Sequence, residues 1–319
     1  MGHVLGDVRK SVLLGLVMPL AIVSLVGRIS EMDLNELPFF SSKSTDGSWL
    51  VTVLQEGKPT EMTMEAYLCR VLPAEMPPSF EPEALKAQAV AARTYTCQSQ
   101  LSAQKHEGAL CTDSRCCQAY STDAQLENLS QEDREKIQQA VTETDGLVLT
   151  YQGAPIEATF FSSSGGRTED AAAVWGRDYP YLRSVESPGE EESPYNESSI
   201  FLYRAELEEL LDISLGEDWG QWVGELSYTS GGGVDRLILG DRSFSGTYLR
   251  RILGLNSTAF TVEPEPDGIC FTTSGYGHRV GMSQYGANAM AEDGADFKEI
   301  LSHYYGGTIL LNYSEFVEE

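Results

Sequence analysis

The strongest constraint on this chain is an uncharged apolar run near its N-terminus, residues 11–27 (SVLLGLVMPLAIVSLVG), which directly follows Arg9 and Lys10. A helix over this run spans about 25 Å, and local thinning of the bilayer compensates for the difference from a hydrocarbon core of ~30 Å. The basic residues in front of the run place the N-terminus in the cytoplasm. We therefore expect residues 11–27 to form an uncleaved transmembrane anchor, with the C-terminal part of the chain outside the cytoplasm.

Two other interpretations of this run stay open. A cleaved signal peptide needs small residues just after its apolar core, and residues 28–31 (RISE) meet that need poorly. A buried core helix is the third interpretation. The chain has no second apolar run of this length, so it is predicted to cross a membrane once at most.

The charge balance excludes one large class of functions. The 319 residues include 22 Lys and Arg against 48 Asp and Glu, which gives a formal net charge of −26 at pH 7. Nucleic-acid binding needs clustered cations that neutralise phosphates, so we exclude it. A cation that matters for a ligand must act locally rather than through a long-range positive field.

The remaining chain divides into a linker and one folded unit. We predict a cytoplasmic tail at 1–10, a polar linker at 28–47, a folded domain at 48–312 and a tail at 313–319. Apolar periodicity predicts helices at 64–72, 82–102, 131–144, 204–212, 283–292 and 296–304, and strands at 49–53, 146–151, 156–161, 225–229 and 234–239. Because this order lacks a repeated strand–helix–strand rhythm, the predicted fold class is α+β.

One glutamate, Glu75, stands between two proline-constrained stretches in residues 71–80 (VLPAEMPPSF). Pro77 restricts Met76 to extended backbone, and the apolar side chains of Met76 and Phe80 flank the acid. Desolvation raises the pKa of a carboxyl group and makes it a usable proton donor near neutral pH. The alternative is an ordinary surface glutamate at a helix end.

Two cations lie seven residues apart on the predicted helix 82–102. Lys86 and Arg93 therefore share a face, at the edge of the apolar stripe of that helix. In a chain with few cations, such a pair can orient a carboxylate or hold a substrate oxygen. The alternative is ordinary surface charge.

A loop at 106–117 carries residue types that ligate zinc, namely His106, Cys111 and Cys117, with Cys116 as a fourth possible ligand. Three protein ligands would leave an open position, as in catalytic zinc sites. The alternative is a disulfide from Cys111 to Cys116 or Cys117 in an oxidising compartment.

Two later segments carry polar groups on loops. Residues 160–169 (FFSSSGGRTE) and the aromatic residues at 179–182 offer hydroxyls such as Ser163 and aromatic faces, which suit sugar rings. The Gly-rich loop at 275–287 presents His278 and Gln284, and it is not a phosphate-binding P-loop because no Gly-Lys-Ser/Thr follows. The alternative for the first segment is a structural turn with core aromatics.

These segments together resemble the stage II sporulation protein D (SpoIID) family, which is related to the amidase-enhancer domain. The matching stretches are 75–80 (EMPPSF), 83–95 (EALKAQAVAARTY), 161–166 (FSSSGG), 178–182 (DYPYL) and 277–287 (GHRVGMSQYGA). The resemblance extends from about residue 50 to 308, and the stretches 85–95 and 278–287 are long and specific.

The resemblance implies a peptidoglycan lytic transglycosylase that cuts between N-acetylmuramic acid and N-acetylglucosamine during spore engulfment. It implies a single elongated extracytoplasmic domain with a substrate cleft, anchored in the mother-cell membrane and facing the septal space. The catalytic role falls on Glu75. Substrate-binding roles fall on Lys86, Arg93, Tyr181 and Glu190, and we add Ser163, His278 and Gln284 as substrate-binding candidates.

The chain departs from the family pattern at two points. The family often reads Ser-Pro-Trp-Asp where residues 187–190 read Ser-Pro-Gly-Glu, and Arg279 replaces a common glycine. Clostridial-type members bind zinc through one His and two Cys, which match His106, Cys111 and Cys117. This implies zinc as a cofactor, which we expect to be structural.

The implied reaction needs one acid only. A hydrolytic glycosidase generally uses two carboxylates. In a lytic transglycosylase, Glu75 would protonate the leaving oxygen and then accept the proton of the C6 hydroxyl, which attacks C1 and closes a 1,6-anhydro ring. Lys86 and Arg93 would anchor the lactyl carboxylate or an N-acetyl carbonyl.

Two further hypotheses stand beside this enzyme. The chain can be a non-catalytic glycan-binding scaffold that enhances a partner amidase, or a zinc hydrolase. The resemblance also implies partners besides peptidoglycan glycan strands: a membrane-anchored amidase, stage II sporulation protein P, and a multispanning protein, stage II sporulation protein M.

Overall fold

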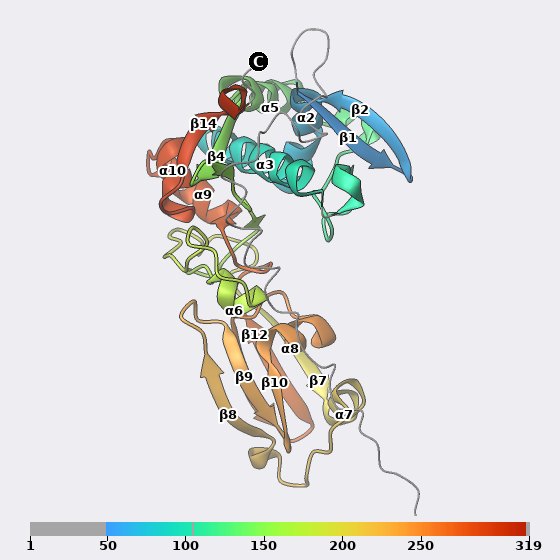
Figure 1. Ribbon diagram of the computed structural model, residues 1–319. Coiled ribbons are helices and arrows are strands. Elements are labelled where there is room, and N and C mark those ends of the chain that lie inside the picture. Colours follow the sequence, from blue (N-terminus) through green and yellow to red (C-terminus); the bar gives the residue numbers. More distant parts are fainter. Residues whose placement is uncertain (1–48, 104, 317–319) are drawn as a thin grey trace, which may run out of the picture.

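The computed structural model describes residues 49–103 and 105–316 (Figure 1). The predicted anchor at 11–27 and the linker at 28–47 lie outside these residues. Within the described ranges, no helix has both the length and the apolar character that crossing a bilayer requires. The fold mixes helices with several small sheets, which confirms the α+β class.

Two apolar cores divide the described chain. The first core draws on residues 51–182 and again on 280–305, and we call this part the helical lobe. The second core draws on residues 207–271, and we call this part the sheet lobe. Figure 1 shows the two lobes at opposite ends of an elongated molecule. The sheet lobe is thus inserted between two segments of the helical lobe.

The long helix α3 (Pro82–Ser102) forms the centre of the helical lobe. Of its 21 residues, 14 are buried, so neighbours cover most of its circumference. Pro82 suits its first turn, and the helix has the predicted bounds. Four helices pack on it: α2 (Met64–Glu75), α5 (Gln131–Glu143), α9 (Gln284–Glu292) and α10 (Phe297–Tyr304). The small alanine side chains of α3 allow this close approach.

Short strands complete the helical lobe. One sheet has the order β2-β1-β3, a second β14-β4-β5, and a third β13-β6. The bounds are β1 (Leu50–Gln55), β2 (Lys58–Thr63), β3 (Leu110–Cys111), β4 (Leu147–Tyr151), β5 (Ala154–Pro155), β6 (Phe160–Phe161), β13 (Met282–Ser283) and β14 (Ile309–Asn312). Val51 and Val53 face the core, as their alternation predicts. The short helices η3 (His106–Gly108), α4 (Asp123–Glu127), α6 (Ala171–Trp175) and η5 (Tyr313–Phe316) lie between or after these strands.

Helix α2 continues two residues beyond Pro73, where it was predicted to stop. Proline lacks an N–H, so it removes one hydrogen bond from the last turn. The N–H of Met76 then donates to the Leu72 carbonyl oxygen at 2.9 Å and closes that turn. Met76 itself is extended (φ −128°, ψ 136°), as the following proline requires. Glu75 is therefore the last residue of a helix, held between two constraints.

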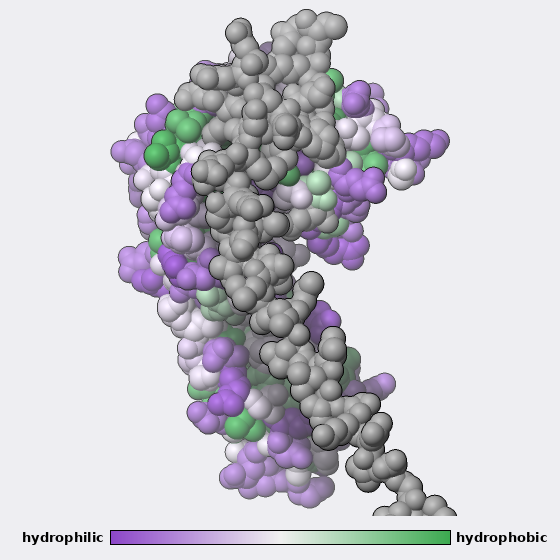
Figure 2. Space-filling model, in the orientation of Figure 1, coloured by the Kyte–Doolittle hydropathy of each residue, from purple (hydrophilic) through white to green (hydrophobic). Residues whose placement is uncertain are grey.

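The sheet lobe contains two antiparallel sheets, with the orders β10-β9-β8 and β11-β12-β7. Its elements are β7 (Ser198–Tyr203), α7 (Arg204–Leu211), η4 (Trp219–Gln221), β8 (Val223–Tyr228), β9 (Val234–Leu239), β10 (Arg242–Ser245), α8 (Gly246–Leu253), β11 (Phe260–Glu265) and β12 (Gly268–Thr273). Leucine and phenylalanine side chains fill its core. On the face shown in Figure 2, hydrophilic side chains predominate on both lobes outside the grey residues.

A buried ion pair joins the lobes. Arg279 Nη1 lies 3.3 Å from Glu169 Oε1, and both side chains are at most 2% exposed. Glu169 also accepts hydrogen bonds from Thr229 Oγ1 (2.7 Å) and from the Gly233 N–H (2.8 Å), both in the sheet lobe. Arg279 has φ +66°, a left-handed conformation that glycine adopts more readily than arginine.

Candidate functional site

Glu75 has the partly desolvated environment that the sequence predicts. It is half-buried at the end of α2, and its neighbours Met76 and Phe80 are 1% and 8% exposed. Its Oε1 accepts a hydrogen bond from the Ala119 N–H at 2.5 Å. Burial raises the pKa of this carboxyl, and the Ala119 hydrogen bond opposes the rise only in part. Glu75 therefore holds its proton at a higher pH than an exposed glutamate, and its catalytic role stays a prediction.

A buried glutamine fixes the position of the Ala119 amide. Gln118 Oε1 accepts hydrogen bonds from Tyr67 Oη and Thr96 Oγ1, each at 3.0 Å. These partners belong to α2 and α3. Gln118 therefore attaches the end of the segment 105–119, which we call the Cys-rich loop, to the two helices beside Glu75. The sequence analysis missed this residue, because a single glutamine in a loop carries no spacing signal.

The Cys-rich loop gathers four metal-ligand side chains. The ligand atoms of His106, Cys111, Cys116 and Cys117 lie within 4.8 Å of one another. His106 Nε2 is 3.3 Å from Cys116 Sγ, and all four residues belong to one short segment. All six cysteines of the chain are free thiols, so the alternative of a disulfide is not realised.

Three thiols and one imidazole form a donor set typical of structural zinc. In a tetrahedron with zinc–sulfur bonds of about 2.3 Å, the sulfurs lie ~3.8 Å apart, so a small inward movement of the four side chains suffices. Cys116 thus lies in one cluster with the three predicted ligands. A set of four leaves no open coordination position, which disfavours a zinc hydrolase.

Lys86 and Arg93 share a face of α3, as predicted, and that face meets the end of α5. Lys86 Nζ pairs with Glu83 (2.7 Å) on its own helix and with Glu143 (2.6 Å) on α5. The Lys86 side chain is 15% exposed, so it lies at the rim of this helix–helix contact.

Arg93 lies inside the protein, and its predicted place at the edge of the buried face is wrong. Its side chain is 0% exposed, because neighbours cover α3 on nearly all sides. The guanidinium donates to the carbonyl oxygens of Leu147 (3.2 Å) and Val141 (3.3 Å) and to Thr144 Oγ1 (3.4 Å). Burial lowers the pKa of Arg93. These bonds fasten the end of α5 to β4, which is a structural arrangement and not a surface for substrate.

Glu190 is also buried, at 2% exposure, and it receives many hydrogen bonds. Ser163 Oγ (2.7 Å), the Ser164 N–H (2.5 Å) and Oγ (2.8 Å), the Gly165 N–H (3.0 Å) and Ser187 Oγ (2.5 Å) all donate to its carboxylate. The acid thus holds residues 163–166, which we call the Ser-Gly turn, in place. Ser163, predicted as a ligand-facing hydroxyl, is 0% exposed.

The tryptophan missing before this acid has a steric explanation. Gly189 has φ +71°, and a Cβ added there would lie 2.3 Å from the Cβ of Ala289 on α9. Only glycine fits this close approach. The departure from the family's Ser-Pro-Trp-Asp pattern therefore goes together with a close approach of the Gly189 backbone to α9.

His278 and Gln284 lie near this turn and apart from Glu75. The His278 ring packs between Phe161 (5.6 Å) and Trp175 (5.2 Å), and its Nδ1 accepts from the Val280 N–H. Burial, with the charge of Arg250, lowers the pKa of His278 to about 4, so the ring is neutral near pH 7. Gln284 is 5% exposed, and it faces Gln88 inside the contact between α9 and α3.

Tyr181 lies beside an acid that the sequence analysis missed. Tyr181 Oη accepts a hydrogen bond from the backbone N–H of Glu157 at 3.2 Å. Burial raises the pKa of Tyr181 to about 12. Burial also raises the pKa of Glu157, against the positive charges of Lys105 and Arg177. Among the described residues, Glu75 and Glu157 are the two carboxyl groups whose pKa is raised. A single glutamate within an apolar stretch gave no pattern to detect.

Two tyrosines connect the surroundings of these acids. Burial raises the pKa of Tyr67, and Cys117 and Glu75 act on it in the same direction. Burial also raises the pKa of Tyr95, where Lys105 opposes the rise and Glu157 adds to it. Glu75 contacts the Cys-rich loop through the Ala119 N–H, and Tyr95 contacts it through Lys105 and the Cys116 carbonyl oxygen. Glu157 contacts Tyr181 and acts electrostatically on Tyr95. We call Glu75, the Cys-rich loop, Glu157 and Tyr181 together the acidic site. Lys86 and Arg93 face α5 instead. The other predicted residues surround the Ser-Gly turn, namely Ser163, Glu190, His278 and Gln284.

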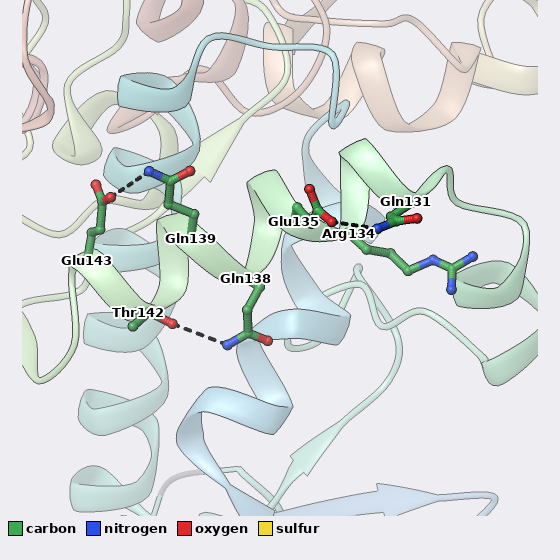
Figure 3. Close-up of a pocket in the computed structure, with 7 residues that line it drawn as sticks. All are labelled: Gln131, Arg134, Glu135, Gln138, Gln139, Thr142 and Glu143. Carbon is green, nitrogen blue, oxygen red and sulfur yellow. Dashed lines mark hydrogen bonds between the residues drawn. The ribbon is translucent and has the colours of Figure 1, made fainter.

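A depression on α5 is separate from the acidic site. Figure 3 shows that its seven lining side chains all come from this one helix. They pair with each other, as in Gln131–Glu135 (2.8 Å) and Gln139–Glu143 (2.6 Å). None of the predicted site residues lines it. We therefore assign no function to this surface.

Several known proteins are similar to this chain in sequence. A sequence profile of the family described as Stage II sporulation protein (SpoIID) matches residues 55–151, which contain Glu75 and the Cys-rich loop. Stage II sporulation protein D of Bacillus subtilis (strain 168) is 39% identical over 264 residues, which cover 80% of this chain and 76% of that protein. Its counterpart in Bacillus amyloliquefaciens is 38% identical over 265 residues, with the same coverage of 80% and 76%.

A protein with a different name is also similar. The amidase enhancer of Bacillus subtilis (strain 168) is 30% identical over 299 residues, which cover 76% of this chain and 40% of that protein. The resemblance predicted from the sequence is thus confirmed along most of the chain. From this identity and coverage, the chain belongs to the stage II sporulation protein D family.

Proposed function

We propose that the protein is a peptidoglycan lytic transglycosylase of sporulating cells, with Glu75 as its single general acid and base. The observation that carries this proposal is the environment of Glu75. A half-buried carboxyl with a raised pKa, fixed by one backbone N–H, is suited to give and take back a proton. Its place at a proline-bounded helix end constrains the backbone that carries this carboxyl.

The proposed mechanism follows from that environment. In its acid form, Glu75 donates its proton to the oxygen between N-acetylmuramic acid and the next sugar, and the glycosidic bond breaks. The carboxylate that forms is stabilised by the Ala119 N–H. It then accepts the proton of the C6 hydroxyl of N-acetylmuramic acid, while the oxygen of this hydroxyl forms a bond to C1 of the same sugar. The 1,6-anhydro ring closes, Glu75 is protonated again, and no water is consumed.

Zinc has a structural place in this proposal. His106, Cys111, Cys116 and Cys117 would hold it, and it would supply a cross-link within the Cys-rich loop. The same loop carries Ala119, two residues after Cys117, so its conformation determines where the hydrogen-bond donor to Glu75 lies. We expect zinc to hold the conformation of this loop and not to act as a Lewis acid.

A second candidate function is a glycan-binding enhancer of an amidase that does not cut. The similarity to a protein named amidase enhancer favours it. Under either function we propose glycan strands, stage II sporulation protein P and stage II sporulation protein M as partners. We also propose membrane attachment through residues 11–27, with the described part outside the cytoplasm.

Purified full-length protein and glycan strands without stem peptides separate the two functions. The enzyme releases fragments with 1,6-anhydro ends, which mass spectrometry detects, and Glu75→Gln releases none. The matched control Glu61→Gln, an exposed acid on β2, keeps wild-type activity. Binding of the strands without any cleavage by the wild type would instead support the enhancer.

A further inference from the structure

We propose that Glu157 is a substrate-binding residue of the acidic site, where its carboxylate accepts hydrogen bonds from hydroxyl or acetamido N–H groups of the glycan. This inference rests on the proposed function and deepens it, because it names a contact that the glycan makes beyond Glu75. The supporting observations are the open hydrogen-bonding capacity of this carboxylate, the groups around it and the tyrosines beside it.

Glu157 is a half-buried acid whose carboxylate has no hydrogen-bond or ion-pair partner among the residues that the structure describes. Its chain neighbours Ile156 and Ala158 are 1% and 0% exposed, so the backbone at this point belongs to the core. Its N–H donates to Tyr181 Oη, and its carbonyl oxygen accepts from the Thr159 N–H. Among residues 49–103 and 105–316, nothing forms a hydrogen bond or an ion pair with its side chain. Burial raises the pKa of this unpartnered carboxyl, and the charges of Lys105 and Arg177 oppose the rise.

The other deeply placed acids of this protein are satisfied by the fold. Five donors surround Glu190, and Glu169 pairs with Arg279, Thr229 and Gly233. A buried polar group without a partner costs free energy, so proteins pair such groups unless a ligand does so. Glu157 therefore has free acceptor sites at a position where the protein does not use them.

Groups from three separate segments interact electrostatically with this carboxyl. Lys105 comes from the Cys-rich loop, Arg177 follows α6, and Tyr95 lies on α3. Lys105 Nζ is already engaged with the Cys116 carbonyl oxygen (2.5 Å) and Tyr95 Oη (3.3 Å). Because two cations already act on Glu157, a ligand ammonium would be repelled by them. Neutral O–H and N–H donors, which a glycan carries in number, fit this environment better.

The adjacent aromatic rings suit the same ligand. The rings of Tyr151 and Tyr181 are 5.5 Å apart, and those of Tyr179 and Tyr181 are 5.6 Å apart. All three side chains are partly exposed, so they combine apolar faces with hydroxyls. A carboxylate acceptor next to such rings is an arrangement that binds a sugar by its hydroxyls and its apolar face together.

The test measures binding in a background that cannot cut. Full-length Glu75→Gln protein is titrated with glycan strands that lack stem peptides, and the double variant Glu75→Gln/Glu157→Gln is compared with it. Loss of a hydrogen bond to a charged group predicts about tenfold weaker binding. The control Glu75→Gln/Glu61→Gln binds as tightly as Glu75→Gln. If thermal melting shows that Glu157→Gln does not fold, Glu157→Asp takes its place. Aspartate keeps the charge but is shorter by one methylene, so we expect a smaller loss of binding affinity.

Kinetics in the otherwise wild-type protein distinguish binding from chemistry. Glu157→Gln should raise KM and leave kcat close to the wild-type value. Unchanged binding, or a lower kcat at unchanged KM, would overturn the proposal, the latter because it places Glu157 in the chemical step. If the wild type releases no anhydro product but Glu157→Gln still weakens binding tenfold, the lytic function fails while the glycan contact stands.

Discussion

The carboxylates of the acidic site and of the Ser-Gly turn differ in how many hydrogen bonds they receive from the protein. At the turn, Glu190 is buried and receives five hydrogen bonds from the protein. In the acidic site, Glu75 receives one and the Glu157 carboxylate receives none among the described residues. Burial with full pairing stabilises a fold, whereas burial with incomplete pairing raises the pKa and leaves acceptor sites for a ligand. Removing each acid should therefore have a different consequence.

The largest expected effect is on catalysis at Glu75. Glu75→Gln keeps the shape of the side chain and an acceptor for the Ala119 N–H, but it removes the titrating proton. We expect the lytic rate to fall by about 10²- to 10⁴-fold, with a melting temperature no lower than that of the wild type. Release of soluble fragments from glycan strands measures the rate, and Glu61→Gln is the control. A variant with wild-type rate would remove Glu75 from the chemistry.

The next effect is on stability at Glu190. Glu190→Gln places an amide N–H₂ against hydroxyl and N–H donors, so several buried donors lose their partner. We expect a loss of about 3 kcal/mol in the free energy of unfolding, by analogy with breaking a buried ionic network. Denaturant unfolding measures it, with Glu191→Gln, an exposed neighbour, as control. If stability is unchanged while glycan binding falls, the contrast between the two regions is wrong.

A smaller effect is expected at the fourth ligand of the Cys-rich loop. If Cys116 completes the donor set, Cys116→Ser should lower zinc affinity by about tenfold or more, measured by competition with a chromophoric chelator. Cys270→Ser, which lies outside the cluster, should bind zinc as the wild type does. Wild-type affinity in Cys116→Ser would restore the three-ligand site that the sequence predicts.

The smallest effect is the pH dependence of stability at Glu75. The pKa of Glu75 in the folded protein is raised above the ordinary value of 4.5. Glu75 therefore contributes to the stability of the fold at pH values below 4.5, and this contribution is lost as the pH rises through the folded-state pKa. Glu75→Gln cannot ionise and avoids that loss. The variant and the wild type should melt alike in acid, and near neutral pH the variant should melt higher. A variant that is less stable near neutral pH would mean that Glu75 is well paired as an anion.

Local patterns predicted much of the fold. Pro82 and the alanine-rich stretch after it place α3 at its observed bounds, and β9 has its predicted bounds of Val234–Leu239. Helices α9 and α10 begin within a residue of their expected starts. Each of these signals lies within a single segment. The insertion of the sheet lobe depends on contacts between distant segments, which no local pattern records.

For the candidate site too, the sequence predicted local features and missed those that depend on distant segments. The desolvation of Glu75 was predictable because its prolines and apolar neighbours are adjacent in sequence. The burial of Arg93 was not, because helix periodicity does not reveal a helix covered on nearly all sides. Glu157 and Gln118 were missed because their roles depend on α2, α3 and the Cys-rich loop meeting in space. Cys116 was recognised as a possible ligand, but only the folded loop brings it together with the other three.

The most direct test of the single-acid mechanism is the origin of the oxygen at the new chain end. Full-length protein digests glycan strands in water enriched in oxygen-18, and mass spectrometry examines the released fragments. Attack by the C6 hydroxyl predicts ends that are lighter by one water than hydrolytic products and carry no heavy oxygen. Ends that contain oxygen-18 would show that water is the nucleophile, and the account of Glu75 acting alone would be contradicted.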